Sequence, residues 1–233
     1  MNNSIPMIQD NIIKVRERIA QACFRGGRNA DAVRLVVISK NRSLNEIKEV
    51  INLGLLDIGE NRLQEAKPKF SELRVQYTGL RTHMVGHLQT NKVKEAVRLF
   101  DLIQSVDSLR LALEINQQAA KIGKVQDILV EIKTSFETTK FGVRPEEAIE
   151  LIDQIAQLKN IRFKGLMTIA PILKQPDEAR PYFRTTRELY DKINEQRITS
   201  NEQLFLSMGM TDDFEVAIEE GSNMIRLGRA VFG

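Results

Sequence analysis

A lysine that directly follows an apolar run is the residue of this sequence best suited to covalent chemistry. The run covers residues 35–39, of which four are apolar, and Lys40 comes next. Such a run is typical of a buried strand in a parallel sheet, and α/β folds place their reactive groups at the carboxyl ends of these strands. Partial burial at such a place lowers the pKa of a lysine and frees its amine for Schiff-base chemistry. The simpler alternative is a lysine that reaches into solvent from a strand end.

Other polar residues and glycines follow further apolar runs, so that a parallel sheet would gather them at one edge. They are Glu60, Asn61 and Arg62, Gly86 and His87, Lys140, Thr168, residues 207–210, and residues 226–229. Taken alone, each has a simpler interpretation as a turn, a helix cap or an ion pair. The glycine-containing stretches 207–210 and 226–229 suit a phosphate, because main-chain N–H groups and a serine hydroxyl bind a dianion. A lysine opposite a phosphate site indicates pyridoxal 5′-phosphate (PLP).

The elements that would position these residues alternate strictly along the chain. Strands are expected near residues 35–40, 56–60, 82–86, 102–106, 127–132, 163–169, 204–207 and 224–228, with helices between them and an amphipathic helix over residues 7–24 before the first strand. Strict alternation implies parallel strands with right-handed crossovers, and eight such units fit a single (β/α)8 TIM-type barrel with an extra N-terminal helix. A doubly wound open sheet is the alternative. No linker or low-complexity stretch divides the chain, so we expect one domain over residues 1–233.

Local signals mark where three of the helices begin. Ser43 with Glu46 three residues later forms a capping-box pattern. Asp107 or Ser108 is expected to cap the helix that follows the fourth strand. Pro145, followed by two acidic residues, is expected to open the helix after the fifth strand, which matches the preference of helix N-termini.

The composition excludes several classes of function. Of the 233 residues, 42% are hydrophobic and 28% are charged, and the net charge of +3 is spread along the chain without a basic stripe for nucleic acid. One cysteine, Cys23, and two histidines, His83 and His87, exclude a disulfide framework and a cysteine-rich or histidine-rich metal site. No apolar run has the length of a membrane span and no signal-peptide core is present, so we expect a cytoplasmic protein. The sequence also lacks the GxGxxG, GxxxxGK[ST], HExxH and GxSxG motifs.

Several motifs, taken together and in chain order, resemble the PLP homeostasis protein family (YggS/PROSC/PipY type). They are VISK (37–40), GENRLQEA (59–66), HMVGHLQTNK (83–92), KFG (140–142), GLMTI (165–169), LSMGMTDDF (206–214), AIEEGS (217–222), IRLG (225–228) and VFG (231–233). None is specific alone. Their order and their spread over nearly the whole chain make the resemblance specific.

This resemblance implies a barrel like the N-terminal domain of alanine racemase, with PLP bound as an internal aldimine on the lysine of the first strand. The implied cofactor-binding residues are Lys40, Asn61, Ser207, Arg226, Gly228 and Arg229. Among them, Ser207 and the backbone around residues 228–229 would hold the phosphate. Arg226 would face the pyridine nitrogen, and Asn61 would line the cofactor.

The family further implies a protein that holds and hands on PLP and takes part in vitamin B6 and amino-acid homeostasis without robust catalytic turnover. The expected ligands are therefore PLP and, as further candidates, amino acids, with no catalytic residue and no metal site. Neither the physiological acceptor of PLP nor a protein partner can be identified from the sequence.

A few positions depart from the family pattern. Thr82 stands where the family usually has tryptophan, and Met84 stands where a bulkier aromatic residue is common. Asn223 occupies the Gly-Ser-Thr position expected near the phosphate. These departures concern local packing, and neither Ser222 nor Asn223 is assigned to the cofactor.

Two enzymatic interpretations remain as alternatives. A PLP-dependent amino-acid racemase needs a base on each face of the cofactor, and in alanine racemase a tyrosine from a separate domain of the partner subunit supplies the second one. We expect no such domain here, and none of the tyrosines, Tyr77, Tyr182 and Tyr190, is expected at a strand end. A Schiff-base aldolase that uses Lys40 without PLP is a weaker alternative. We therefore expect a PLP carrier, and a monomer, because the racemase dimer interface would be absent.

Overall fold

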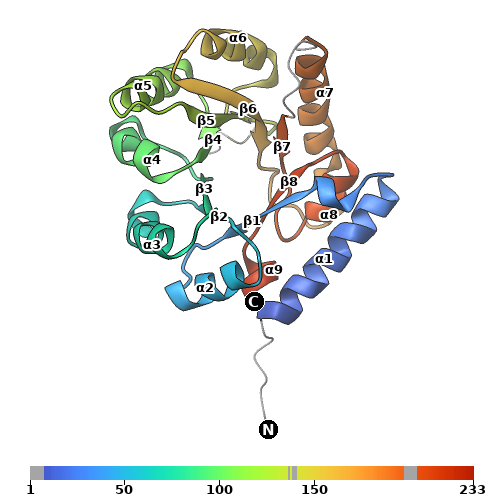
Figure 1. The fold of residues 1–233 in the computed structure, drawn as a ribbon. Helices are drawn as coiled ribbons and strands as arrows, with labels where there is room; N and C mark the ends of the chain where they lie inside the picture. Colours follow the sequence, from blue (N-terminus) through green and yellow to red (C-terminus); the bar gives the residue numbers. More distant parts are fainter. Residues whose placement is uncertain (1–7, 136, 138–140, 197–203) are drawn as a thin grey trace.

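Eight parallel strands close into a barrel in the computed structural model, which describes residues 8–135, 137, 141–196 and 204–233 (Figure 1). Each strand pairs with the next along the chain, and β1 closes the ring by pairing with β8. The strands are β1 (Arg34–Ile38), β2 (Asp57–Glu60), β3 (Arg81–Met84), β4 (Leu102–Val106), β5 (Gln126–Ile132), β6 (Ile161–Thr168), β7 (Phe205–Ser207) and β8 (Met224–Leu227). The predicted (β/α)8 barrel is confirmed, and the open sheet is excluded because an open sheet would leave β1 and β8 unpaired.

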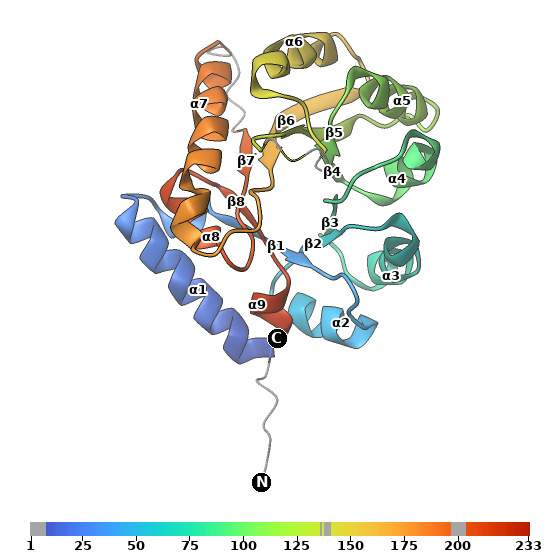
Figure 2. The same cartoon turned by 180° about the vertical axis from the view of Figure 1, so that it is seen from behind.

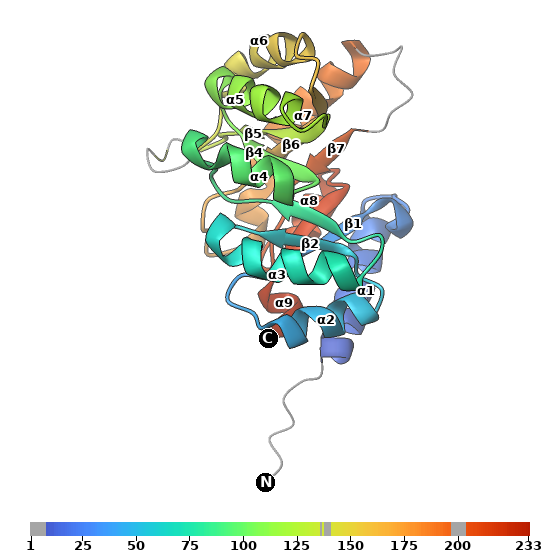
Figure 3. The ribbon, with the colours of Figure 1, turned by 60° about the vertical axis from the view of Figure 1, so that its left-hand side comes forward.

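Helices surround this barrel on its outside (Figures 1 and 2). They are α2 (Leu44–Asn52), α3 (Leu63–Gln76), α4 (Val93–Leu99), α5 (Leu109–Ala120), α6 (Pro145–Ala156), α7 (Arg180–Gln196), α8 (Phe214–Glu219) and α9 (Arg229–Phe232), with short 3₁₀ turns η1 (Ala30–Ala32), η2 (Thr90–Lys92) and η3 (Pro176–Ala179). Seen from the side, α2 to α5 follow one another in chain order along one wall (Figure 3). Within the described ranges, no helix is long and apolar enough to cross a membrane.

The predicted N-terminal helix is α1 (Ile8–Arg25), which packs against α8 and α9 beside the barrel (Figure 2). Its apolar residues recur at helical spacing and are buried: Ile8, Ile12, Val15, Ile19, Ala22 and Cys23. Each fully buried side chain of the size of isoleucine or valine stabilises the fold by about 1.5–3 kcal/mol. The helix therefore covers α8 and α9 at the side of the barrel.

The expected helix starts are confirmed in detail. Ser43 and Glu46 form the reciprocal hydrogen bonds of a capping box, with the Ser43 N–H donating to Glu46 Oε2 at 2.8 Å. At α5 the cap is Ser108, whose Oγ accepts from the Leu111 N–H at 3.4 Å. Pro145 occupies the first turn of α6.

The alternation of side chains along each strand divides the core into two parts. One part lies between strands and helices, and the other fills the barrel interior with Val36, Leu102, Leu129, Met167 and Met224. Residues two positions further along a strand face the same way. The interior therefore continues from Leu129 to Glu131 and from Met224 to Arg226, and it becomes polar toward the carboxyl ends of the strands.

Three boundaries differ from the expectations. Strand β1 ends at Ile38, so Lys40 lies in a turn beyond it and not within the strand. The connection between β6 and β7, where one helix is expected, contains a 3₁₀ turn, η3, followed by α7. The last helix, α9, was not predicted, because four residues after a glycine give no periodic signal.

Candidate functional site

Lys40 and Asn61 stand at the carboxyl ends of neighbouring strands, and a buried ionic cluster beneath them fixes both turns. The carboxylate of Glu60, which is fully buried, accepts from Lys69 Nζ at 2.7 Å, from the Ser39 hydroxyl at 3.1 Å and from the Asn61 N–H at 3.0 Å. Lys69 also donates to the Ser39 carbonyl at 2.8 Å. These three donors satisfy the buried charge of Glu60. Because Ser39 follows β1 and Asn61 follows β2, the cluster holds the ends of these two strands together.

The Lys40 side chain itself is exposed, which differs from the partial burial expected from the sequence. The physical reason is its place in the turn, two residues past the end of β1 at Ile38. Within the described residues, its Nζ forms no hydrogen bond or ion pair. The amine is therefore free to meet a ligand at the barrel mouth.

Asn61 carries a polar atom without a partner. Its Oδ1 is buried and has no hydrogen bond among the described residues. The chain just after β3 approaches Asn61 closely at Gly86. A Cβ added to Gly86 would lie 2.2 Å from the Asn61 carbonyl oxygen. Buried polar atoms are normally satisfied, so an acceptor left open beside Lys40 indicates a donor on a ligand.

Arg226 is the buried cation of the site. Its side chain points into the barrel at the end of β8, where NH1 donates to Ser207 Oγ at 2.6 Å and NH2 donates to the Thr168 carbonyl at 2.8 Å. It is 4% exposed and forms no ion pair with any described residue. Burial lowers the pKa of Arg226 to about 10, against the opposing effects of Asp213 and Glu131, so the guanidinium keeps its charge at neutral pH. A buried charge without a counter-ion is costly, and a ligand that accepts hydrogen bonds would relieve it.

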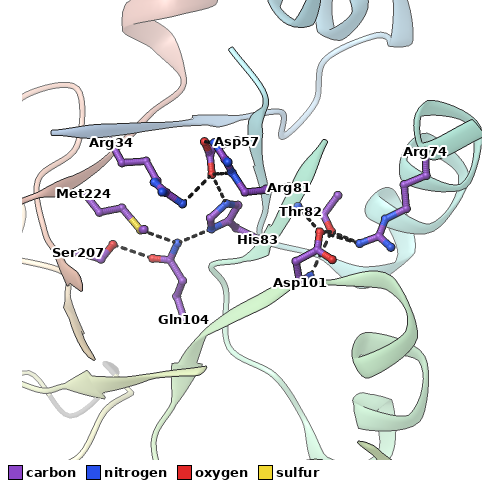
Figure 4. A network of polar contacts seen from close by, with 10 residues as sticks. All are labelled: Arg34, Asp57, Arg74, Arg81, Thr82, His83, Asp101, Gln104, Ser207 and Met224. Carbon is purple, nitrogen blue, oxygen red and sulfur yellow. Dashed lines mark hydrogen bonds and ion pairs between the residues drawn. The ribbon is translucent and has the colours of Figure 1, made fainter. Parts of the chain in front are cut away.

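Ser207 is fully buried and links Arg226 to a chain of side chains that crosses the barrel interior (Figure 4). Its hydroxyl donates to Gln104 Oε1 at 2.7 Å while its oxygen accepts from Arg226. The single hydroxyl proton is therefore committed to Gln104 in this structure. The hydrogen bond to a phosphate that was predicted for this hydroxyl would require that bond to be given up.

The chain continues from Gln104 to the opposite end of the barrel. Gln104 Nε2 lies 3.1 Å from His83 Nδ1, and His83 Nε2 lies 3.0 Å from Asp57 Oδ1. Because an amide nitrogen only donates, His83 accepts at Nδ1 and carries its proton on Nε2, which donates to Asp57. Burial raises the pKa of Asp57. Hydrogen bonds from His83 and then Arg81 outweigh this effect and hold the pKa of Asp57 well below its usual range. Figure 4 shows Arg34 and Arg81 closing the chain around Asp57.

The two glycine-containing stretches lie side by side at the ends of β7 and β8. The Arg226 N–H donates to the Gly209 carbonyl at 3.0 Å, and Gly209 has a φ of 97° where it packs against α8. Gly228 precedes α9, and its carbonyl accepts from the Val231 N–H at 3.0 Å. The Arg229 side chain is exposed and pairs with Asp212 at 2.5 Å, so the atoms of Arg229 available at this junction belong to its main chain.

Glu131, on β5, was not identified from the sequence as a site residue. It is 7% exposed, and burial first, then the charge of Asp107, raise its pKa to about 7 against the opposing effect of Arg226. The stretch DILVEI was assigned to a strand, and its alternation places Glu131 on the same side as Leu129. That alternation is the signal that could have found it.

Other residues discussed from the sequence fall elsewhere. Lys140 lies outside the described residues. Asn223 lies at the amino end of β8, where it bonds to the main chain of Leu204 and Leu206. The expectation that position 223 lies near the phosphate is therefore wrong, because the mouth is at the opposite end of this strand. Thr82 is buried against Arg74 and Asp101 outside the barrel (Figure 4).

The mouth of the barrel therefore combines four kinds of group. An exposed amine and an unpaired amide oxygen lie at the ends of β1 and β2, and a buried guanidinium lies at the end of β8. Two glycine-containing turns at β7 and β8 bring main chain to the same edge. An amine can react with a carbonyl, and the guanidinium can donate to an anion or a ring nitrogen. Within the described ranges, no group of three or more His, Cys, Asp or Glu side chains is placed to hold a metal ion.

Comparisons with known proteins agree with this geometry. Residues 28–233 match the family model described as alanine racemase, N-terminal domain. A pyridoxal phosphate homeostasis protein of Aquifex aeolicus is 44% identical over 224 residues, which cover 96% of this chain and 96% of that protein. PipY of Synechococcus elongatus PCC7942, solved with PLP bound, superposes with a TM-score of 0.80 at 33% identity and covers 94% of this chain and 100% of PipY. The crystal structure of an unknown protein from Bifidobacterium adolescentis superposes with a TM-score of 0.87 at 34% identity and covers 100% of this chain and 97% of that one. The chain belongs to the pyridoxal phosphate homeostasis protein family, whose barrel is that of the alanine racemase N-terminal domain.

Proposed function

We propose that the protein binds PLP at the carboxyl-end mouth of the barrel and takes part in vitamin B6 and amino-acid homeostasis, without robust turnover. The observation that carries the proposal is Arg226, a buried guanidinium without a counter-ion among the described residues. The unpaired Oδ1 of Asn61 supports the proposal. The Arg226 guanidinium fits a ligand that has acceptors, and the Asn61 oxygen fits a ligand that has a donor. The relationship to PipY, whose structure was solved with PLP bound, supports the choice of ligand.

Lys40 is proposed as the residue that carries the cofactor covalently. PLP supplies an aldehyde that condenses reversibly with a primary amine and, in enzymes, a ring that can draw electrons from that amine's substituent. The exposed Nζ at the end of β1 is open to such an aldehyde, and the Glu60 cluster beneath Ser39 and Asn61 keeps this turn in place. Asn61 orients the cofactor through its open amide oxygen.

Arg226 and the residues around it are proposed to set the character of the site. A guanidinium offers only donors, so it favours an unprotonated ring nitrogen and disfavours electron withdrawal through the ring. The phosphate would be held by the main chain at Gly228 and Arg229. Ser207, whose hydroxyl contacts Arg226 and Gln104, contributes by holding the guanidinium in place.

The racemase alternative lacks support from the described residues. Tyr77 directly follows α3, and Tyr182 and Tyr190 lie on α7, where the Tyr190 hydroxyl donates to the Leu204 carbonyl at 2.9 Å. None of these tyrosines lies at a carboxyl strand end, so none is placed as a second base. We further propose one domain over residues 1–233, a monomer and a cytoplasmic location. Sedimentation tests the monomer, and a species of twice the chain mass would contradict it.

The covalent site is tested by reduction and peptide mapping. Protein incubated with PLP is expected to show a near-visible absorption band, and borohydride followed by mass spectrometry should locate the fixed cofactor on Lys40. Lys40→Ala should lose both signals. Lys67→Ala, which removes an exposed lysine from α3, should keep them. A full-occupancy reduced adduct in Lys40→Ala would move the site to another lysine, with Lys140 examined first.

A further inference from the structure

A cavity of about 300 Å³ opens between the carboxyl ends of β3, β5 and β6, and none of the residues assigned to PLP lines it. Its apolar wall is made by Val85, Ile132, Ile169 and Phe141. The Phe141 ring stacks on His87 with ring centroids 3.6 Å apart and closes one side. The volume suits a small organic molecule, since it equals the liquid volume of about ten water molecules.

The carboxylate of Glu131 lines this cavity without a partner. Across the described part of the chain, it forms no hydrogen bond and no ion pair, although it is only 7% exposed. Buried carboxylates in proteins are ordinarily paired or hydrogen-bonded, because an isolated one is costly. Glu131 is thus a negative group at the mouth that no described residue pairs with directly, because the charge of Arg226 acts on it from beyond ion-pair distance.

Ser135 gives a second, independent indication in the same cavity. Its Oγ is buried, the residue is 9% exposed, and no described residue bonds to this hydroxyl. The neighbouring hydroxyl of Thr134 already lies 3.3 Å from Thr168 Oγ1. A ligand that donates to both Glu131 and Ser135 would satisfy two orphaned groups at once.

The chemistry of these groups selects a primary ammonium. An ammonium has three donors and one positive charge, which match one carboxylate and one hydroxyl acceptor. One carboxylate is too few ligands for a divalent cation. Lys133 also lines the cavity, but Glu131 and Ser135 are the two groups that lack a partner, and a carboxylate there repels an anion. The apolar wall suits a short aliphatic chain on the amine.

We propose that this cavity binds the ammonium group of a small primary amine, such as an aliphatic α-amino acid, through Glu131 and Ser135. The proposal rests on the proposed function, because the amine would dock at the same mouth as PLP and is the chemical class that accepts its aldehyde. The proposal thus names the place where an amine that can react with the PLP aldehyde binds.

Calorimetry on the cofactor-free protein at pH 8 tests the site, with L-alanine and propionate as probes. L-Alanine should bind and propionate, which lacks the amine, should not. Glu131→Gln should weaken L-alanine about tenfold or more, as expected for a lost bond between charged groups, and Ser135→Ala should weaken it several-fold. The matched control Glu150→Gln, on the exposed face of α6, should bind L-alanine as the wild type does.

Each outcome separates this inference from the proposed function. Equal L-alanine affinity in the wild type and in Glu131→Gln would overturn the inference, as would equal binding of propionate or no binding of L-alanine to the wild type. A circular dichroism spectrum that matches that of the wild type would show that Glu131→Gln is folded. Failure of the wild type to bind PLP would instead refute the proposed function.

Discussion

Replacing Glu131 by glutamine should stabilise the cofactor-free protein at alkaline pH. Burial, and then the charge of Asp107, raise the pKa of Glu131 from 4.5 to about 7. At about 1.36 kcal/mol per pH unit, that difference corresponds to about 3 kcal/mol of unfolding free energy. Glutamine keeps the shape of the side chain and carries no charge, so it removes this cost.

The sign follows from the direction of the pKa difference. The folded protein holds the Glu131 proton more tightly than the unfolded chain, so the free energy of unfolding falls as pH rises from about 4.5 to about 7. The charged and titratable groups around it are present in both proteins: Arg226 on β8, Asp107 after β4, His87 after β3 and Lys133 after β5. The gain of Glu131→Gln over the wild type should therefore grow with pH.

Urea unfolding followed by circular dichroism measures this gain. Between pH 5 and pH 8 the advantage of Glu131→Gln should increase by about 2–3 kcal/mol. Glu150→Gln should show no such trend, because its carboxylate is exposed. A stability difference that is independent of pH, or a variant that is weaker at pH 8, would show that the Glu131 carboxylate is already paired and would refute the reasoning.

Three further substitutions test the residues at the mouth and beneath it. Ser207→Ala should weaken PLP and pyridoxal alike by about tenfold or more in a spectroscopic titration, because it frees Arg226; a loss confined to PLP would indicate a phosphate contact. Gln104→Leu should destabilise the protein by about 1–3 kcal/mol in urea, because it leaves Ser207 and His83 without a partner; unchanged stability would contradict the buried chain. Asn61→Ala should weaken PLP while leaving stability within about 0.5 kcal/mol, since its Oδ1 has no partner to lose; a large loss of stability would show that the side chain is structural.

The sequence was sufficient to predict the barrel and its order of strands, because alternation and helix caps are local signals. The capping box at Ser43 and the start of α6 at Pro145 are confirmed for that reason. The exposure of Lys40 was not predictable in the same way. It depends on where β1 ends, at Ile38, two residues before the lysine.

The buried polar chain could not be derived from the sequence, because it depends on register between strands far apart. Ser207 and Gln104 are 103 positions apart, and their contact requires β4 and β7 to face each other across the barrel. The place of Glu131 on the same side of β5 as Leu129 follows from the alternation of side chains along a strand. Fully buried parallel strands are apolar on both sides, however, so the alternation in DILVEI groups Glu131 with Leu129 but does not show that this set faces the interior.

The central claim, that the protein holds PLP without turning over an amino acid, is tested most directly by proton exchange. Protein loaded with PLP is incubated with L-alanine in deuterated water, and the α-proton is followed by NMR. Arg226 is proposed as a donor to the ring, and the described part of the mouth holds no tyrosine. We therefore expect the α-proton signal to persist, while the absorption spectrum changes when the amino acid is added. Loss of the α-proton signal, or racemisation, at enzyme-like rates would contradict the account and favour a racemase.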